Sequence, residues 1–203
     1  MKLTNRFNKL VAAAILTGCA YAPQTFADTD SVVGMPWYFG VGITASDLSF
    51  NDKNLSTMYS GNADSTFSHS GNAFKLFGGY QFDPLLSMEF GYTSFGEIVM
   101  TNDEAKRNLF DVDGAYVSAI ATQPISKNVD VLAKGGMFFW SLNDSDDNSI
   151  EDGQGLTYGA GLNINFYGNK ERSLLIEWEH YSFSGVALKE ADSIGASLKF
   201  KFR

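Results

Sequence analysis

Eight stretches of the chain alternate apolar and polar residues with a period of two. The stretch 193–203 does so most strictly, with apolar residues at Ile194, Ala196, Leu198, Phe200 and Phe202 and polar or small residues between them. Alternation over about ten residues predicts a β-strand with one apolar and one polar side. The predicted strands are 37–46, 73–82, 86–93, 110–123, 129–140, 156–166, 173–183 and 193–203.

The connections between these strands alternate in length. Long polar segments are expected at 47–71, 94–109, 141–155 and 184–192, and short turns at 83–85, 124–128 and 167–172. A strand that crosses a bilayer needs roughly 9–11 residues, and an even number of strands with short turns on one side is typical of outer-membrane barrels. The pattern therefore predicts an all-β, eight-stranded antiparallel up-and-down transmembrane barrel with short periplasmic turns and four longer extracellular loops.

The charged side chains indicate which face lies inside this barrel. They fall on the polar face of the strands, and the predicted interior charges are Lys75, Glu89, Lys134, Glu177, Glu179, Lys199 and Lys201. Opposite charges in a narrow interior can offset one another's desolvation. A loop centred near residue 188 would place Glu177 opposite Lys199, and Lys75 is expected close to Glu89. The alternative is a soluble protein whose polar sheet face meets water.

The strand 110–123 has the least certain register. We assign Ala115, Val117, Ala119 and Ala121 to the lipid face and Tyr116, Ser118, Ile120 and Thr122 to the interior. The opposite register stays open.

Aromatic residues gather at both ends of the apolar faces. Trp37, Phe39, Tyr80, Phe82, Phe166, Phe200 and Phe202 lie toward the short turns, and Tyr92, Phe139, Tyr158 and Trp178 lie toward the long loops. Such girdles are expected at the two lipid–water boundaries of a barrel.

Large side chains are predicted to fill the interior. They are Tyr38, Phe77, Gln81, Tyr116, Lys134, Trp140 and Tyr181, and the inward glycines that give them room are Gly40, Gly42, Gly79, Gly91, Gly159 and Gly161. Eight strands leave a lumen just wide enough for side chains, so we expect no wide diffusion pore.

The N-terminal residues have the pattern of an export signal. Lys2, Arg6 and Lys9 precede a short apolar run at 10–16. We predict a signal peptide at 1–27, a periplasmic lead-in at 28–35 and the barrel domain at 36–203. Cleavage after Ala22 in place of Ala27, and lipidation of Cys19, are alternatives for the same segment.

Charge and length exclude two classes of function. The 203 residues include 15 Lys and Arg against 23 Asp and Glu, and removal of 1–27 would take away three basic residues and no acidic one. A strongly acidic exported chain is a poor candidate for binding nucleic acid. No later segment approaches the roughly 18 consecutive apolar residues of a spanning helix, so a role in the membrane has to come from strands.

Several of the predicted strands carry glycine and aromatic motifs: FGGYQF at 77–82, MEFGY at 88–92, KGGM at 134–137, YGAGL at 158–162 and KFKF at 199–202. On these motifs the chain resembles the OmpA-type or opacity-type eight-stranded outer-membrane barrels over residues 36–203. The resemblance implies a bacterial outer-membrane location, contact with outer-membrane lipid and lipopolysaccharide, and assembly by the barrel-assembly machinery. It covers the barrel domain only, so no peptidoglycan-binding domain is implied. Arg203 after Phe202 departs from the family's terminal aromatic.

The tripeptide at 180–182 is the sharpest catalytic candidate. His180 and Ser182 share the predicted outward face, and Glu190 follows in the next loop. A lipid A deacylase of the eight-stranded barrel type uses a His-x-Ser pair with a carboxylate, an arrangement that activates serine. The resemblance rests on this tripeptide alone, and the alternative is that His180 is an interfacial aromatic beside Trp178.

The acidic residues of the third loop are the candidate metal ligands: Asp144, Asp146, Asp147, Glu151 and Asp152. Several oxygens can hold a divalent cation, but the spacing of a calcium loop is missing, and a solvated loop is the alternative interpretation. Because the sequence has no zinc spacing, phosphate loop or dinucleotide glycine pattern, we predict no cofactor.

Three functions fit these features. The first is a non-enzymatic barrel that binds a surface ligand through its four loops. The second is a lipid A-modifying hydrolase that uses His180 and Ser182. The third is a narrow ion channel.

Overall fold

The computed structural model describes residues 37–50, 66–69, 73–101, 107–144, 149–166, 171–185 and 188–202. These residues form nine antiparallel strands: β1 (Trp37–Phe50), β2 (Thr66–His69), β3 (Ala73–Gln81), β4 (Leu86–Thr101), β5 (Arg107–Pro124), β6 (Val129–Asp144), β7 (Ser149–Asn165), β8 (Arg172–Ser182) and β9 (Leu188–Lys201). The described residues include no helix long and apolar enough to cross a membrane.

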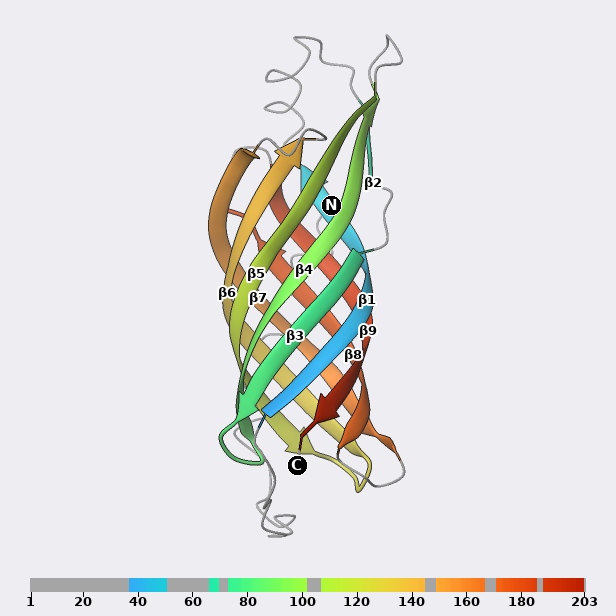
Figure 1. Cartoon of the computed structure of the whole chain (residues 1–203), viewed down its shortest axis with the longest axis vertical. Coiled ribbons are helices and arrows are strands. Elements are labelled where there is room, and N and C mark those ends of the chain that lie inside the picture. Colours follow the sequence, from blue (N-terminus) through green and yellow to red (C-terminus); the bar gives the residue numbers. More distant parts are fainter. Residues whose placement is uncertain are drawn as a thin grey trace, which may run out of the picture. The chain divides into compact units, whose positions relative to one another are not determined.

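Eight of these strands close into a barrel (Figure 1). Each strand from β3 to β8 pairs with the next one along the chain, and β9 pairs with β1, which in turn pairs with β3. The closing pair of strands is held from Tyr38↔Lys201 to Phe50↔Leu188. The predicted eight-stranded antiparallel barrel is confirmed. The ninth strand, β2, lies in the predicted loop 47–71 and pairs with the upper part of β4, above β3 (Figure 1).

All four predicted long loops are wrong in their extent, because strands continue into them, as β1 does to Phe50. β4 ends at Thr101 and β5 begins at Arg107. β6 ends at Asp144 and β7 begins at Ser149. β9 likewise begins at Leu188, within the predicted loop 184–192. Backbone hydrogen bonding needs only a neighbouring strand. The ladders therefore continue into segments where the polarity of the two faces differs from the pattern used to predict the strands.

A β-bulge allows β4 to continue past its predicted end. The register with β5 shifts between Ser94 and Glu97, and Gly96 has a φ of 79°. A bulge of this kind inserts one extra residue and favours glycine in the left-handed region. It leaves the side chain of Phe95 fully buried.

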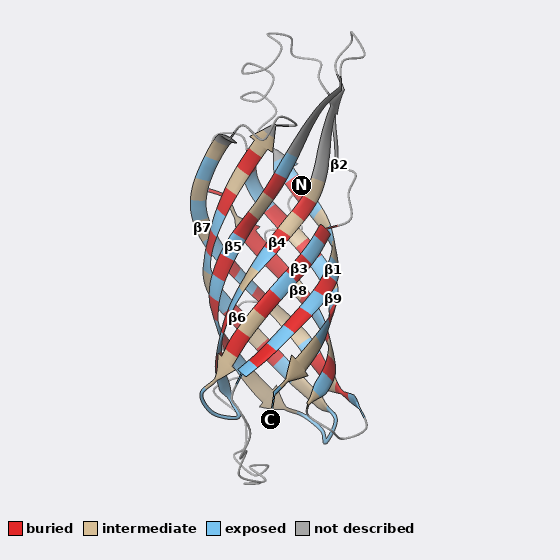
Figure 2. Ribbon diagram, in the orientation of Figure 1, coloured by how far each residue is buried: buried red, intermediate tan, exposed pale blue. Residues whose placement is uncertain are grey.

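Buried and exposed residues alternate along the strands of the barrel wall (Figure 2). The outer face carries exposed apolar residues such as Ile43, which is 72% exposed, whereas Lys75 and Glu89 are buried inside. The polar face of the strands therefore lines the interior. The assigned register of β5 is also correct, because Tyr116, Ser118 and Ile120 are buried.

Side-chain oxygens close two of the short turns. The Asp83 carboxylate accepts hydrogen bonds from the backbone N–H groups of Leu85 (2.7 Å) and Leu86 (2.9 Å). The Ser126 hydroxyl accepts one from Val129 N–H at 3.1 Å. Such local bonds stabilise tight turns. We call this end of the barrel the turn end and the opposite end the loop end.

Candidate functional site

Five charged side chains meet in the middle of the barrel interior, and we call them the central charge cluster: Lys75, Glu89, Lys134, Glu177 and Glu179. All five are buried. Lys75 Nζ lies 2.9 Å from carboxylate oxygens of both Glu177 and Glu179 and 3.9 Å from Glu89 Oε1. Lys134 Nζ lies 3.3 Å from Glu89 Oε1 and 3.2 Å from Glu177 Oε1, and it also contacts Glu179. Each lysine thus contacts all three carboxylates, and the two positive charges offset part of the desolvation cost of the three negative ones.

Tyrosine side chains surround this cluster. Tyr116 donates to Glu89 Oε1 at 2.8 Å, and the hydroxyl of Tyr38 lies 3.4 Å from Glu89 Oε2. The ammonium groups of Lys75 and Lys134 lie 5.3 and 5.1 Å from the centre of the Tyr116 ring, within the range of a cation–π interaction. The inward glycine Gly91 faces this ring, and a Cβ there would overlap it. The middle of the lumen is therefore filled.

The predicted pairing of Glu177 with Lys199 is wrong. Glu177 lies opposite Gly195, and Lys199 lies opposite Ser173. The connection between β8 and β9 is centred earlier in the chain than residue 188. Glu177 therefore pairs with a residue four positions before Lys199. Because that number is even, both side chains keep their inward face. Lys199 Nζ lies 4.4 Å from the centre of the Tyr38 ring.

Polar side chains line the interior toward the turn end. Lys201 donates to Gln81 Oε1 at 2.9 Å. Asp130 Oδ2 accepts hydrogen bonds from Asn163 (2.9 Å) and Asn165 (3.1 Å). These residues extend the polar lining of the lumen below the central charge cluster.

Five aromatic side chains fill the interior above the central charge cluster, and we call them the aromatic plug: Phe95, Phe138, Trp140, Tyr181 and Phe183. Phe138 lies 4.9 Å from Tyr181 and 5.8 Å from Phe95 between ring centres, in edge-to-face contacts. Trp140 packs against Phe183 at 5.3 Å. Such pairs are more favourable than area burial alone suggests.

The sequence prediction named two members of the aromatic plug, Trp140 and Tyr181, and left out Phe95, Phe138 and Phe183. Phe95 lay in a predicted loop, and Phe183 at the end of a predicted strand was not recognised as inward. The Phe95-Gly96 pair is a signal for a bulge that redirects a large side chain, and it offers the one sequence cue for Phe95.

The predicted girdle residues lie on the outer face. Near the turn end, Trp37 contacts Tyr80 at 5.0 Å, and Phe39 stacks between Phe200 and Phe202 at 5.1 and 5.2 Å. Phe82 and Phe166 are exposed in the same region.

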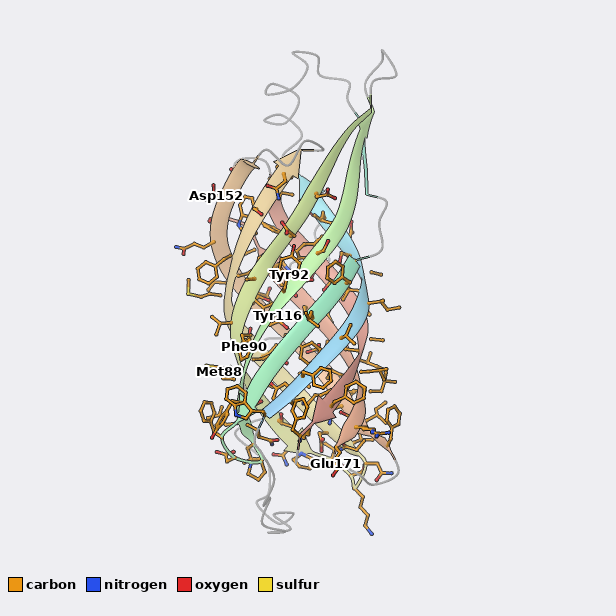
Figure 3. The ribbon with its side chains drawn as sticks, in the orientation of Figure 1. Met88, Phe90, Tyr92, Tyr116, Asp152 and Glu171 are labelled. Atoms are coloured by element: carbon orange, nitrogen blue, oxygen red, sulfur yellow. The ribbon has the colours of Figure 1, made fainter. Side chains whose placement is uncertain are left out.

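Nearer the loop end, Tyr158 contacts Trp178 at 6.0 Å, and Phe139 is exposed. Tyr92 shares its face of β4 with Met88 and Phe90 (Figure 3). Phe74, which the prediction left out, lies 6.0 Å from Tyr92.

In the structure, His180 and Ser182 of the candidate catalytic set have other hydrogen-bond partners. His180 Nδ1 lies 3.1 Å from Asp192 Oδ1, not beside Glu190, and its ring stacks on Tyr158 at 4.8 Å. The Ser182 hydroxyl accepts a hydrogen bond from Leu156 N–H at 2.9 Å and donates one to Leu156 O at 3.1 Å. Glu190 lies opposite Ser182 in the β8–β9 ladder. In this arrangement the serine hydroxyl serves the backbone of the neighbouring strand.

The candidate metal ligands are only partly described. Asp146 and Asp147 lie outside the described residues, as does the side chain of Asp144. Glu151 and Asp152 are neighbours in β7, so their side chains leave opposite faces of the strand, and Asp152 is exposed at the loop end (Figure 3). Within the described ranges, no group of three His, Cys, Asp or Glu residues is placed to hold a metal ion.

At the loop end the polarity of the two faces is reversed. Asp47, Glu190 and Asp152 are exposed on the outer face, whereas Leu48 and Leu188 are buried inside. The pattern in this region is that of a sheet whose outer face meets water.

Comparisons with known proteins agree with this architecture. The model of the family described as "OmpA-like transmembrane domain" matches residues 35–170. No curated protein matches the sequence. Neisserial surface protein A is 15% identical with a TM-score of 0.63, over 83% of this chain and 99% of that one. OprG from Pseudomonas aeruginosa is 12% identical with a TM-score of 0.52, over 83% and 97%.

Ail from Yersinia pestis, solved with the heparin analogue sucrose octasulfate, is 16% identical with a TM-score of 0.50, over 82% of this chain and 99% of that one. At these identities the similarity to solved structures concerns the fold alone. The family match covers well over half of the chain. The chain therefore belongs to the OmpA-like transmembrane domain family and is an outer-membrane β-barrel.

Proposed function

We propose that the protein is a non-enzymatic surface barrel that conducts no ions and binds a partner at its loop end. The observation that carries this proposal is the filled lumen. The central charge cluster occupies its middle, and the aromatic plug, with Phe138 fully buried, occupies the part above. A path for ions would have to pass both. The loop end is then the part of the barrel that is free to recognise a partner in the medium.

The charge of the loop end supports a cationic partner. Ail was solved with a heparin analogue, which is a polyanion. In this chain Asp47, Asp152 and Glu190 are exposed on the outer face near the loops. Like charges repel, so a polyanion is disfavoured here and a basic partner is favoured.

Planar-bilayer recording of the purified protein tests the plugged lumen. We expect no discrete conductance steps, and regular steps that reproduce between preparations would overturn the non-conducting part of the proposal. Binding at the loop end is tested on intact cells, by deleting residues 51–65, 102–106 and 145–148 one segment at a time. Partner binding that survives every deletion would remove the loops from the proposal.

Export by the segment 1–27 is part of the same proposal. The basic residues and the apolar run at 10–16 support it. Mass spectrometry of the protein from outer membranes should find an N-terminus at Asp28. A first residue at Pro23 would indicate cleavage after Ala22, and an acylated Cys19 would indicate a lipoprotein.

A further inference from the structure

A positively charged side chain lies on the outer face of β8 at the turn end. It belongs to Arg172, the first residue of the strand, which is exposed and follows the labelled Glu171 (Figure 3). Leu174 and Ile176 share its face, because alternate residues of a strand point to the same side, and Ile176 is 39% exposed. The residues between them, Ser173 and Leu175, are buried. The outer face of β8 therefore begins with a cation and continues with apolar side chains.

Aromatic residues of the girdle place Arg172 at the lipid–water boundary. Arg172 lies opposite Phe200 in the β8–β9 ladder, and Phe200 stacks on Phe39 at 5.1 Å. On the other side of β8, the exposed Phe166 follows the last β7 residue of the β7–β8 ladder. Phe166 and Phe200 thus lie on either side of Arg172 in the sheet. Girdles of this kind mark the level of the lipid headgroups.

The backbone of Arg172 is held in the sheet while its side chain is exposed. The ladder with β9 includes Arg172 itself, and Lys201 N–H donates to Glu171 O at 2.7 Å just before it. A long basic side chain anchored at this level can extend its charged end into the headgroup layer. Its guanidinium group has a planar set of donors that matches the oxygens of a phosphate. Arg172 is therefore suited to bind a phosphate group at the turn end.

Apolar surface extends from Arg172 toward the middle of the membrane. Leu198 lies opposite Leu174 in the β8–β9 ladder and is 44% exposed. Leu162 lies opposite Ile176 in the β7–β8 ladder and is 41% exposed. This surface is continuous with the lipid-facing side of the barrel, where acyl chains pack. A ligand that fits both parts has a negatively charged head and apolar tails.

We propose that the outer face of the barrel at Arg172 binds a phospholipid of the periplasmic leaflet through its phosphate group. The guanidinium group donates to the phosphate oxygens, Phe166 and Phe200 border the headgroup, and the acyl chains lie along Leu174 and Ile176. This inference goes beyond the proposed surface function, since it concerns a lipid at the opposite end of the barrel and does not depend on the loops.

Native mass spectrometry of the full protein, released from detergent micelles, tests the proposal. The probes are phosphatidylglycerol and a diacylglycerol with the same acyl chains, which lacks the phosphate. The chain has 23 Asp and Glu against 15 Lys and Arg, so its net charge disfavours an anionic lipid. We nevertheless expect the first phosphatidylglycerol to bind about fivefold more tightly than diacylglycerol, the preference that one basic side chain near a phosphate supplies. Equal affinities would show that only the acyl chains are recognised, and the proposal would be wrong.

Substitutions assign the preference to one side chain. Arg172→Gln should remove most of the difference between the two lipids, whereas Arg172→Lys keeps the charge and should retain part of it. Lys127→Gln is the matched control, because Lys127 is also an exposed cation at the turn end but lies in the turn before β6. It should leave the difference unchanged.

A cold and a boiled gel sample of each variant show whether the barrel has folded, and the shift in mobility should match the wild type because Arg172 and Lys127 are exposed. A preference for phosphatidylglycerol that survives in folded Arg172→Gln would overturn the proposal. So would an equal loss in Lys127→Gln, since any cation at the turn end would then suffice. Neither result would bear on partner binding at the loop end.

Discussion

The membrane-spanning part of the barrel and its loop end have opposite polarity across the same wall. In the lower part of β1, Val41 faces out and is exposed, while Tyr38 is buried inside. In the upper part of the same strand, Asp47 faces out and Leu48 faces in. The same reversal is found in β5, where Asp111 faces out and is exposed and Val112 is fully buried inside.

The reversal shows where each strand leaves the lipid. Below it the outer face meets hydrocarbon and the polar side chains gather inside. Above it the outer face meets water, so the apolar side chains are buried in the lumen as in a soluble sheet. The central charge cluster belongs to the first region and the aromatic plug to the second.

Strand β6 passes from one region to the other. Its inward side chains run from Lys134 in the central charge cluster through Gly136 to Phe138 in the aromatic plug. Substitutions along β6 therefore compare the central charge cluster with the aromatic plug within a single strand.

The largest effect is expected from Lys134→Met. It leaves Glu89, Glu177 and Glu179 buried with Lys75 as their cation within the cluster. Removing one partner of a buried ion pair costs about 3–5 kcal/mol. Urea unfolding in lipid vesicles, followed by tryptophan fluorescence, measures the loss. Lys127→Met, in an exposed turn, is the control, and equal stability of the two variants would contradict a stabilising role for the cluster.

A smaller loss is expected from Phe138→Ala in the aromatic plug. The ring of Phe138 contacts Phe95, Tyr181 and Phe183, and truncating a buried phenylalanine costs about 3 kcal/mol. The same unfolding experiment measures it. Phe139→Ala, which truncates an exposed outward neighbour, should cost less. The reverse order would indicate that lipid contact stabilises this strand more than the plug does.

Gly136→Ala should cost less again. A Cβ at Gly136 would collide with Val117 O and would come within 2.6 Å of Ser118 Cα, so the neighbouring backbone has to move. Overpacking of this kind costs roughly 1–3 kcal/mol. The adjacent Gly135 faces outward, and its nearest neighbour would be 4.0 Å away, so Gly135→Ala should change the free energy of unfolding by less than about 0.5 kcal/mol. Equal costs would contradict the close packing of β5 against β6.

The sequence was sufficient to predict the membrane-spanning part, because lipid on the outside and the lumen on the inside impose a strict period of two on the side chains. That constraint predicted the strands, the closure and the inward face of Lys75, Glu89 and Lys134. At the loop end the same alternation continues with inverted polarity, as in Asp47 and Leu48, and it was interpreted as loop. The inversion could have been found only in part, since Ala191 lies between Glu190 and Asp192, whereas the register shift between Glu190 and Leu188 breaks the period of two.

Contacts between distant strands could not be predicted from the pattern. The meeting of Lys75 with Glu177 and Glu179 joins β3 to β8 across the lumen, and no local spacing records it. The register of β8 with β9 depends on the length of a loop that the pattern does not define. For the same reason His180 was assigned Glu190 as its carboxylate, whereas the ladder brings Asp192 beside it.

The smallest effect is expected from Ser182→Ala, which also separates the proposed function from the hydrolase alternative. The variant loses the two hydrogen bonds between the Ser182 hydroxyl and the backbone of Leu156, so it should lower the free energy of unfolding by about 1 kcal/mol. Ser182→Thr keeps a hydroxyl and should retain most of the stability.

Mass spectrometry of lipid A from cells that express the wild type, Ser182→Ala or no protein completes this test. We expect the same acylation in all three, because the Ser182 hydroxyl bonds to the backbone of Leu156 on the neighbouring strand. Lipid A that loses an acyl chain with the wild type and regains it with Ser182→Ala would make the protein a hydrolase. Altered stability with unchanged lipid A would instead assign Ser182 to the β7–β8 seam, where its hydroxyl stands in for a missing backbone pair.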